Sequence, residues 1–395
     1  MLDTDISSTL RIGQVEELEL RWLLIDSFSG ALYDDSSVGV GFYPDRNRAA
    51  IKLIYSRRDL VQAIAGPSLS RSILKELQGR VDSEILSSVG RKITGAVFLS
   101  EKPVGGYFRL KDSFQILPPP GDAPKPDLSL PGLYPRHPFL VEVSFEASSN
   151  DALNGLRKYR KQYELELVLN ALLDGSVSCT TTSARRYRWV LWPKADHHKP
   201  PASVFVQDGY RCHGYPAESS RFSRAESIPK LEEVDPSTYY KLTWAPSMSL
   251  GLPSDFSIKL DSFYGLARTE REAWLRACHW LRHSSVAVWN SRSAAFVALV
   301  TAVEALMPRR DRGKRREFES FIDRFAPSRG LQQDRSRFYR IRSELAHGED
   351  LRYEDTDHGL VSITPRISEG LREFEAMRSV AKLVIVNWLA DVARP

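Results

Sequence analysis

Residues 293–307 are apolar on almost every side of the helix that they would form. Mainly Thr301 and Glu304 interrupt this apolar surface. A helix with no polar face must be surrounded by other elements, so it is expected at the centre of its domain. Pro308 ends the run, because proline lacks the backbone donor that the next helical turn needs. The chain from about residue 256 onward is therefore expected to form a helical bundle around this segment.

Four further helices are predicted to surround this central helix. The first opens at Thr269, where Thr269 as N-cap and Glu272 at the third helical position are typical of a capping box. The others are predicted at residues 318–325, 331–347 and 366–392. Gly348 directly follows the helix predicted at 331–347, and glycine is the usual residue just past a helix C-terminus. Together the patterns predict an all-α domain at 256–395.

The first 250 residues or so combine strand and helix patterns. Alternating and β-branched runs predict strands at 49–55, 93–99, 107–117, 139–145, 187–192 and 203–207, and apolar periodicity predicts helices at 70–88 and 150–173. A proline-rich loop at 118–126 marks a candidate subdivision near 118–131, and long loops are expected across 194–241. The fold class is thus expected to be α+β: a mixed α/β region at 1–252 followed by the helical domain.

Composition narrows the classes of protein further. An apolar fraction of 42% and a charged fraction of 27% are typical of a globular protein. No apolar run approaches the roughly 20 residues that a membrane span needs. The first five residues are acidic rather than basic, so export is not expected. Cys179, Cys212 and Cys278 are scattered, which favours neither a metal cluster nor a disulfide framework. We expect a cytoplasmic protein without a membrane partner, metal or cofactor.

The positive charge is concentrated in the C-terminal part. Residues 1–255 carry 31 basic and 31 acidic side chains, whereas residues 309–342 carry 12 basic and 5 acidic ones, a local excess of +7. Such a segment attracts phosphate backbones. The candidate RNA-binding residues are those of the loop that opens the segment: Arg309, Arg310, Arg312, Lys314, Arg315 and Arg316. The alternative is a solvated charged face without a ligand.

The helix predicted at 331–347 ends in the motif Arg342-Ser343-Glu344-Leu345-Ala346-His347-Gly348. With the apolar helix that contains Glu304 and a long last helix, this motif resembles the HEPN domain, in particular its Apea-like branch, over about residues 260–395. The resemblance implies a metal-independent endoribonuclease of the toxin or antiviral-defence type. It also implies a homodimer, formed through the bundle, in which paired motifs face one cleft. By position, Arg342 and His347 would be the catalytic pair, Ser343 the polar residue after the arginine, and Glu304 the acidic residue of the central helix.

The chemistry of these side chains is compatible with that activity. RNA supplies its own nucleophile, the 2′-hydroxyl, so no metal is needed. His347 would transfer the proton, and general acid–base catalysis of this kind raises the reaction rate by roughly 10²–10⁴-fold. Arg342 would stabilise the negative charge that develops on the phosphorane-like transition state. The predicted products carry a 2′,3′-cyclic phosphate and a 5′-hydroxyl. Five residues on a helix correspond to about 140° around its axis, so the pair would converge most easily across a two-fold dimer.

Several alternatives stay open. Arg342 and His347 could serve only the helix end, with Arg342 bound to Glu344 or Glu304. A carboxylate on an apolar helix needs a cation, and Arg342 is the leading candidate for the partner of Glu304. The bundle could also be a catalytically inactive module that binds RNA or protein and dimerises. A third reading places a site in the N-terminal region, which is otherwise expected to sense a trigger or a regulatory partner. Its candidates are weak: the pair Glu142 and Glu146, and the motifs His197-His198 and Cys212-His213.

Overall fold

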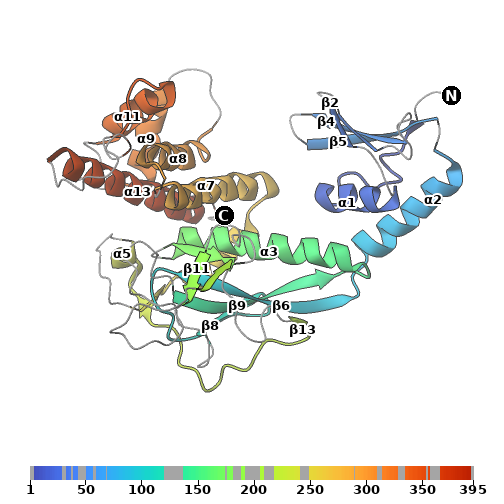
Figure 1. The fold of residues 1–395 in the computed structure, drawn as a ribbon, viewed down its shortest axis with the longest axis horizontal. Coiled ribbons are helices and arrows are strands. Elements are labelled where there is room, and N and C mark those ends of the chain that lie inside the picture. The colour runs from blue at the N-terminus through green and yellow to red at the C-terminus, as the bar shows by residue number, and fades with distance from the viewer. Residues whose placement is uncertain are drawn as a thin grey trace. The chain divides into compact units, whose positions relative to one another are not determined.

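The structure, a computed structural model, describes residues 4–28, 33–36, 39–42, 50–56, 59–67, 69–119, 137–173, 176–180, 188–191, 205–208, 218–240, 249–288, 290–308, 314–327, 334–352, 355 and 365–392. The chain divides into two compact units (Figure 1). Unit 1 comprises Met1–Thr94, Ser144–Lys161 and Glu218–Arg221. Unit 2 comprises Gly95–Val143, Gln162–Ala217 and Phe222–Pro395.

Unit 1 contains an antiparallel sheet with its own core. Its five strands, β1 (Thr4–Asp5), β2 (Tyr33–Ser36), β3 (Gly39–Phe42), β4 (Ile51–Ser56) and β5 (Asp59–Ala65), lie in the order β1-β5-β4-β3-β2. Helix α1 (Glu17–Ser27) buries Leu20, Leu23 and Leu24 in the same cluster as Ile51 and Leu53 of β4. Helix α2 (Arg71–Arg80) continues directly into a turn of π-helix, Val81–Leu86.

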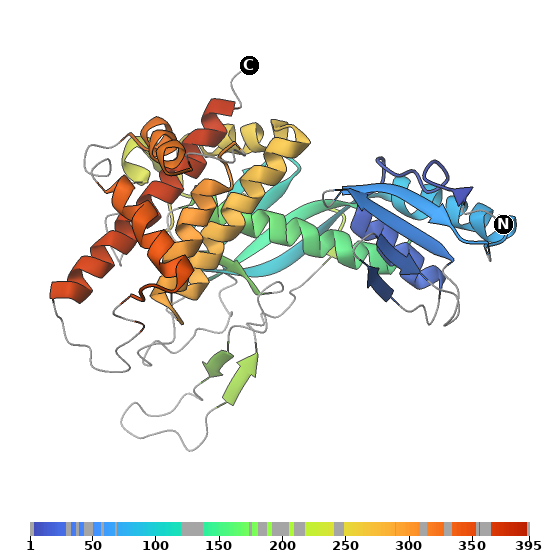
Figure 2. The same ribbon diagram turned by 90° about the horizontal axis from the view of Figure 1, so that it is seen from above.

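The second sheet has six strands. Strands β10 (Val177–Cys179), β6 (Gly90–Ser100), β9 (His137–Ala147), β8 (Phe114–Leu117) and β7 (Phe108–Leu110) lie in this order, and β13 (Glu218–Ser219) also pairs with β6. Helix α3 (Asp151–Leu172) lies along one face of this sheet (Figures 1 and 2). The chain passes between the units within β6, β9 and α3. Smaller elements of unit 2 are the β11 (Arg188–Leu191) and β12 (Phe205–Asp208) pair, the parallel pair β14 (Glu233–Val234) and β15 (Leu252–Pro253), and α5 (Pro236–Tyr239).

The helical part of unit 2 is a bundle around α8. Its helices are α6 (Phe256–Gly265), α7 (Arg268–Ala287), α8 (Arg292–Glu304), α9 (Lys314–Phe325), α11 (Arg335–His347) and α13 (Pro365–Val392). Helix α8 packs against α7, α11 and α13, and most of its side chains are buried. The expected α+β class, with a mixed region followed by helices, is therefore confirmed. The central position expected for the segment around residues 293–307 is confirmed as well.

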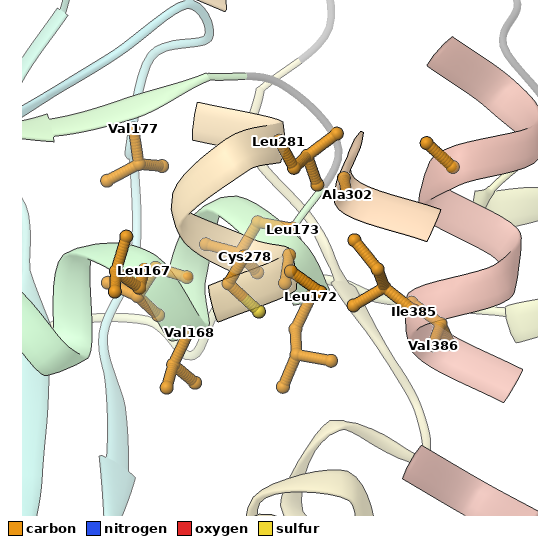
Figure 3. Packing of buried hydrophobic residues seen from close by; sticks show 14 of the residues in the cluster. Leu167, Val168, Leu172, Leu173, Val177, Cys278, Leu281, Ala302, Ile385 and Val386 are labelled. Atoms are coloured by element: carbon orange, nitrogen blue, oxygen red, sulfur yellow. The ribbon is translucent and has the colours of Figure 1, made fainter. Parts of the chain in front are cut away.

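The core of unit 2 joins the sheet to the bundle. Leu167, Val168 and Leu172 of α3 belong to the same buried cluster as Cys278 of α7 and Ile385 of α13 (Figure 3). The C-terminal half of α3 is buried nearly throughout, because one side faces the strands and another faces the bundle. The division between the compact units consequently does not follow the predicted boundary at 252–256, since unit 2 contains residues on both sides of it.

Helix starts differ in detail from the sequence predictions. The capping box expected at Thr269 is wrong, because α7 begins two residues earlier with Ala267 as its N-cap. Glu270, rather than Glu272, accepts a hydrogen bond from the Ala267 backbone N–H at 3.3 Å. Helix α6 was not predicted, whereas α8, α9, α11 and α13 correspond to the predicted helices. Gly348 ends α11 with φ +72°, as predicted.

The strand predictions are largely confirmed. Strands β4, β6, β9, β11 and β12 fall on predicted ranges, and the run at 107–117 is a hairpin of β7 and β8 rather than one strand. Most of the proline-rich loop at 118–126 lies outside the described residues. Among the helices that the structure describes, none combines the length and the apolar character that crossing a membrane requires.

Candidate functional site

The motif helix α11 is fixed to the bundle by aromatic side chains. Phe338 is fully buried and lies with its ring centroid 6.2 Å from that of Phe296 on α8. The ring of Tyr339 lies 5.4 Å from that of Phe318 on α9. Ile341, also buried, continues this apolar side. These contacts determine the rotation of α11 about its axis and hence the directions in which the motif side chains point.

Arg342 points toward the central helix and pairs there with Glu304. The guanidinium NH2 donates to the Glu304 carboxylate Oε2 at 3.1 Å. The two side chains are 28% and 23% exposed, so water still screens the pair in part. The Arg342 Nε is buried and has no hydrogen-bond acceptor among the described residues. The pairing of these two residues, which the apolar surroundings of Glu304 predicted, is confirmed.

His347 lies in a different environment. It is the last residue of α11 and its side chain is exposed. No described residue hydrogen-bonds to its imidazole. The helix closes behind it through two backbone hydrogen bonds, from Gly348 N to Leu345 O at 3.3 Å and from Glu349 N to Glu344 O at 2.9 Å. A solvent-exposed imidazole at a closed helix end can exchange protons with a bound ligand.

Within one copy of the chain, no interaction among the described residues joins the side chains of Arg342 and His347. Arg342 is turned to α8, and His347 is exposed at the end of α11. This divergence follows from a separation of about 140° around the helix axis. Ser343, between them in sequence, is half-buried. The two predicted catalytic groups therefore share a helix but not one face of it.

Most arginines of the basic segment that the structure describes form ion pairs. Arg315 pairs with Glu319 at 3.0 Å, Arg324 with Asp391 at 2.6 Å and Arg337 with Glu369 at 2.6 Å. Further pairs join Arg335 to Asp323, Arg340 to Glu344 and Arg337 to Glu373. The Glu369 hydrogen bond raises the pKa of Arg337, and a hydrogen bond from Ser336 lowers the pKa of Glu319. The local excess of positive charge read from the sequence is thus partly compensated by carboxylates outside the segment, namely Glu344 of α11 and Glu369, Glu373 and Asp391 of α13.

Most of the predicted RNA-binding loop lies outside the described residues. Arg309, Arg310 and Arg312 belong to that part, and of Lys314 only the backbone is described. Arg315 and Arg316 are exposed at the start of α9. Arg316 has no ion-pair partner among the described residues, whereas Arg315 is held by Glu319.

Asp355 organises the start of the central helix, which sequence reasoning missed. Its carboxylate accepts hydrogen bonds from the Ser291 hydroxyl at 2.7 Å, from Arg292 N at 2.7 Å and from Ser293 N at 2.9 Å. Burial acts to raise the pKa of Asp355, but the hydrogen bonds from Ser293, Ser291 and Arg292 outweigh it and the pKa is lowered. Ser291 as N-cap is readable from the sequence, but its partner more than sixty residues away is not.

The N-terminal candidates do not form a metal site in the described part of the chain. Glu142 is buried and accepts hydrogen bonds from Gln115 Nε2 at 2.6 Å and from Ser223 N at 2.8 Å. Its carboxylate is therefore occupied in holding the segment around Ser223 against the sheet. Glu146 instead accepts from the Ser88 hydroxyl at 2.8 Å. Among the described residues, no group of three or more His, Cys, Asp or Glu side chains could hold a metal ion.

The motifs His197-His198 and Cys212-His213 lie outside the described residues. Cys179 and Cys278 are buried and unbonded to each other, and burial raises the pKa of the Cys278 thiol. A thiol whose pKa is raised in this way is not a reactive nucleophile.

No family model matches the chain, and comparison with curated proteins and with solved structures also finds no match. What the site does is therefore inferred from its own residues.

Proposed function

We propose that this protein is a metal-independent endoribonuclease of the HEPN type, acting as a toxin or antiviral effector, with Arg342 and His347 as its catalytic pair. The observation that carries the proposal is the placement of the motif. An exposed imidazole ends α11, five residues after a guanidinium that Glu304 holds at 3.1 Å. One residue is thus accessible for proton transfer, and the other is held in a defined position.

The proposed reaction uses only groups of the protein and the RNA. The 2′-hydroxyl attacks the adjacent phosphorus, the bond to the 5′-oxygen of the next nucleotide breaks, and His347 transfers the proton that this exchange requires. Arg342 stabilises the additional negative charge of the phosphorane-like transition state. The products then carry a 2′,3′-cyclic phosphate and a 5′-hydroxyl.

A homodimer through the helical bundle accompanies this proposal. Because Arg342 and His347 diverge around α11, one copy does not present them on a common face. A two-fold arrangement would bring Arg342 of one subunit near His347 of the other, since isologous interfaces place the same residues of both subunits around the axis. The mixed α/β region is proposed to sense the trigger or to bind a regulatory partner.

The decisive experiment incubates purified protein with RNA in the presence of EDTA and analyses the ends of the products. Cyclic phosphate and 5′-hydroxyl ends are expected from the wild type. Arg342→Ala and His347→Ala are each expected to abolish cleavage. Arg340→Ala is the matched control, because Arg340 lies on the same helix, is exposed and pairs only weakly with Glu344 at 3.7 Å. Full cleavage by either motif variant, or a requirement for a divalent metal, contradicts the assignment.

A second candidate function is a catalytically inactive module that binds RNA or protein. The ion pairing of the arginines favours it, because Arg342 donates to Glu304 and most other described arginines of the basic segment face carboxylates. This alternative predicts that RNA is retained without product formation, and that His347→Ala leaves the affinity unchanged. Binding by the 309–316 loop should weaken steeply as salt is raised from 50 to 200 mM, by an amount on the order of tenfold per two phosphate contacts.

A further inference from the structure

Unit 2 contains a cavity of about 420 Å³ that the predicted site does not use. It lies where β7, the segment 225–233, β15 and the first turn of α6 meet. Its volume falls in the range of about 300–1,000 Å³ that is usual for small-molecule sites. No motif pointed to it in the sequence, because its walls come from three separate stretches of the chain.

The walls of this cavity are held in place by backbone contacts. Tyr107 N donates to Pro229 O at 2.8 Å, and Leu231 N donates to Tyr107 O at 2.9 Å. At Gly106 a Cβ atom would come within 2.8 Å of the backbone of Lys230 and Leu231, so only glycine permits this approach. The cavity is therefore preformed, which lowers the cost of ordering the site when a ligand binds.

The floor of the cavity is apolar and partly aromatic. The Phe108 and Phe256 rings meet edge to face with their centroids 5.1 Å apart. Leu231 and Leu252, both buried, complete the floor. A surface of this composition favours an apolar or aromatic group of a ligand.

The rim carries charges of both signs that are not neutralised within the described part of the chain. Glu226, Glu233 and Lys230 line the cavity, are exposed and have no ion-pair or hydrogen-bond partner among the described residues. Ser254 and Ser257, from the start of α6, add hydroxyl groups.

Arg109 also lines the cavity but is already engaged. Its Nε donates to Gln115 Oε1 at 2.8 Å, its NH2 donates to Ser223 O at 3.0 Å, and its guanidinium lies 5.1 Å from the centre of the Phe222 ring. These acceptors are uncharged, so Arg109 keeps its positive charge, and the charged groups that line the cavity are two carboxylates, one ammonium group and one guanidinium.

We propose that this cavity binds a small zwitterion with an apolar side group, of the free amino-acid class. The ligand ammonium lies at Glu226 and Glu233, the ligand carboxylate lies at Lys230 and the two serine hydroxyls, and the side group rests on Phe108 and Phe256. The charges that line the cavity are balanced, with Glu226 and Glu233 against Lys230 and Arg109, which suits a zwitterion better than a ligand with only negative charge. The inference concerns a ligand site and does not depend on the proposed RNA cleavage.

The test titrates each of the twenty free amino acids into the full-length protein by isothermal calorimetry and thermal-shift measurement. Large apolar or aromatic amino acids are expected to bind with one site per chain. We then compare the amino acid that binds most tightly with two analogues, one that lacks its carboxylate and one that lacks its amine. Each analogue is expected to bind at least tenfold more weakly. Binding of nucleoside monophosphates in place of amino acids, or no amino acid binding at millimolar concentration, overturns the proposal.

Two pairs of variants locate the binding. Ser257→Trp fills the cavity from an exposed position and should abolish binding, whereas Ile258→Trp, at a neighbouring residue that is 68% exposed and does not line the cavity, should leave it intact. Glu233→Gln should weaken binding at least tenfold, and Glu232→Gln, exposed and outside the lining, should not. Unchanged melting temperatures of the ligand-free variants exclude misfolding. Equal affinity of Ser257→Trp and wild type would show that the ligand binds elsewhere.

Discussion

Arg342 on α11 donates a hydrogen bond to Glu304 on α8 across 3.1 Å. This contact links α11 to α8, the most buried helix of the bundle. Arg342 is also one of the two residues to which catalysis is assigned. A carboxylate in this position has two opposed effects. It positions the guanidinium, and it competes with any phosphate for the same donor.

Glu304→Gln separates these two effects. The amide retains the shape and one acceptor but removes the charge. Because the pair is partly exposed, the free energy of unfolding is expected to fall by no more than about 1 kcal/mol. If positioning dominates, RNA cleavage falls at least threefold, and by less than the loss in Arg342→Ala, which is expected to be on the order of 10²-fold or more. Denaturant unfolding and single-turnover cleavage measure the two quantities, and a Glu304→Gln variant that cleaves faster than wild type would instead identify Glu304 as an inhibitory partner.

His347→Ala is expected to change activity and not stability. The side chain is exposed and makes no hydrogen bond to any described residue, so the free energy of unfolding should stay within about 0.5 kcal/mol of wild type. Cleavage should fall by roughly 10²–10⁴-fold, the usual contribution of a general acid or base. A large loss of stability would show that the imidazole serves the helix end, which is the structural alternative.

Asp355→Asn is expected to destabilise the bundle by about 1–2 kcal/mol at pH 7, because the carboxylate accepts three hydrogen bonds at the start of α8. The pKa of Asp355 is lowered in the folded protein. Its contribution is therefore present above the unfolded pKa, roughly 3.9, and is lost as the pH falls through the folded value. Urea unfolding at pH 7 and below pH 4 should show the difference between wild type and variant shrinking with acid. Asp350→Asn, at an exposed residue that bonds only the adjacent Leu351 N–H, is the control.

Glu166 of α3 and Arg282 of α7 form an ion pair, and we expect their contributions to the free energy of unfolding to be strongly coupled. The Arg282 Nε donates to Glu166 Oε1 at 2.7 Å, and the two side chains are 9% and 0% exposed. Glu166→Leu leaves a buried guanidinium without its carboxylate and should cost about 3–5 kcal/mol, whereas Glu166→Leu with Arg282→Leu should cost clearly less. A double-mutant cycle on unfolding free energies measures the coupling, and additive effects would contradict it.

A fragment of residues 256–395 is expected to be unstable or to aggregate. Removing α3 exposes apolar side chains of the bundle, because Leu172 and Leu173 of α3 lie in one buried cluster with Cys278 of α7 and Ile385 of α13 (Figure 3). A fragment that begins at residue 95 retains these contacts. Circular dichroism melting and size-exclusion chromatography of the two fragments compare them directly, and cooperative unfolding of the shorter one with wild-type stability would support the boundary that the sequence suggested.

The sequence by itself determined the class of the fold and most of its elements. Local rules were sufficient for this, because each signal extends over only a few residues. These signals are the apolar periodicity of the helices, the proline at 308 that ends a helix and the glycine that follows His347. The pairing of Glu304 with Arg342 also followed from the sequence, since a carboxylate on an apolar helix requires a cation. The start of α7 was placed two residues too late, because local capping rules favour Thr269, whereas the observed N-cap is Ala267, a residue type that those rules disfavour.

Tertiary structure alone decided four features. It placed α3 in one core with the bundle, because burial depends on which surfaces meet and not on where composition changes along the chain. It paired described arginines of the basic segment with carboxylates of α13 that lie outside this segment in the sequence, as Arg324 with Asp391 and Arg337 with Glu369 show. It formed the cavity beside β7 and the Asp355 cap from residues that are distant in the chain. Each of these depends on long-range contacts, whereas the features readable from the sequence depend on neighbours within one or two turns.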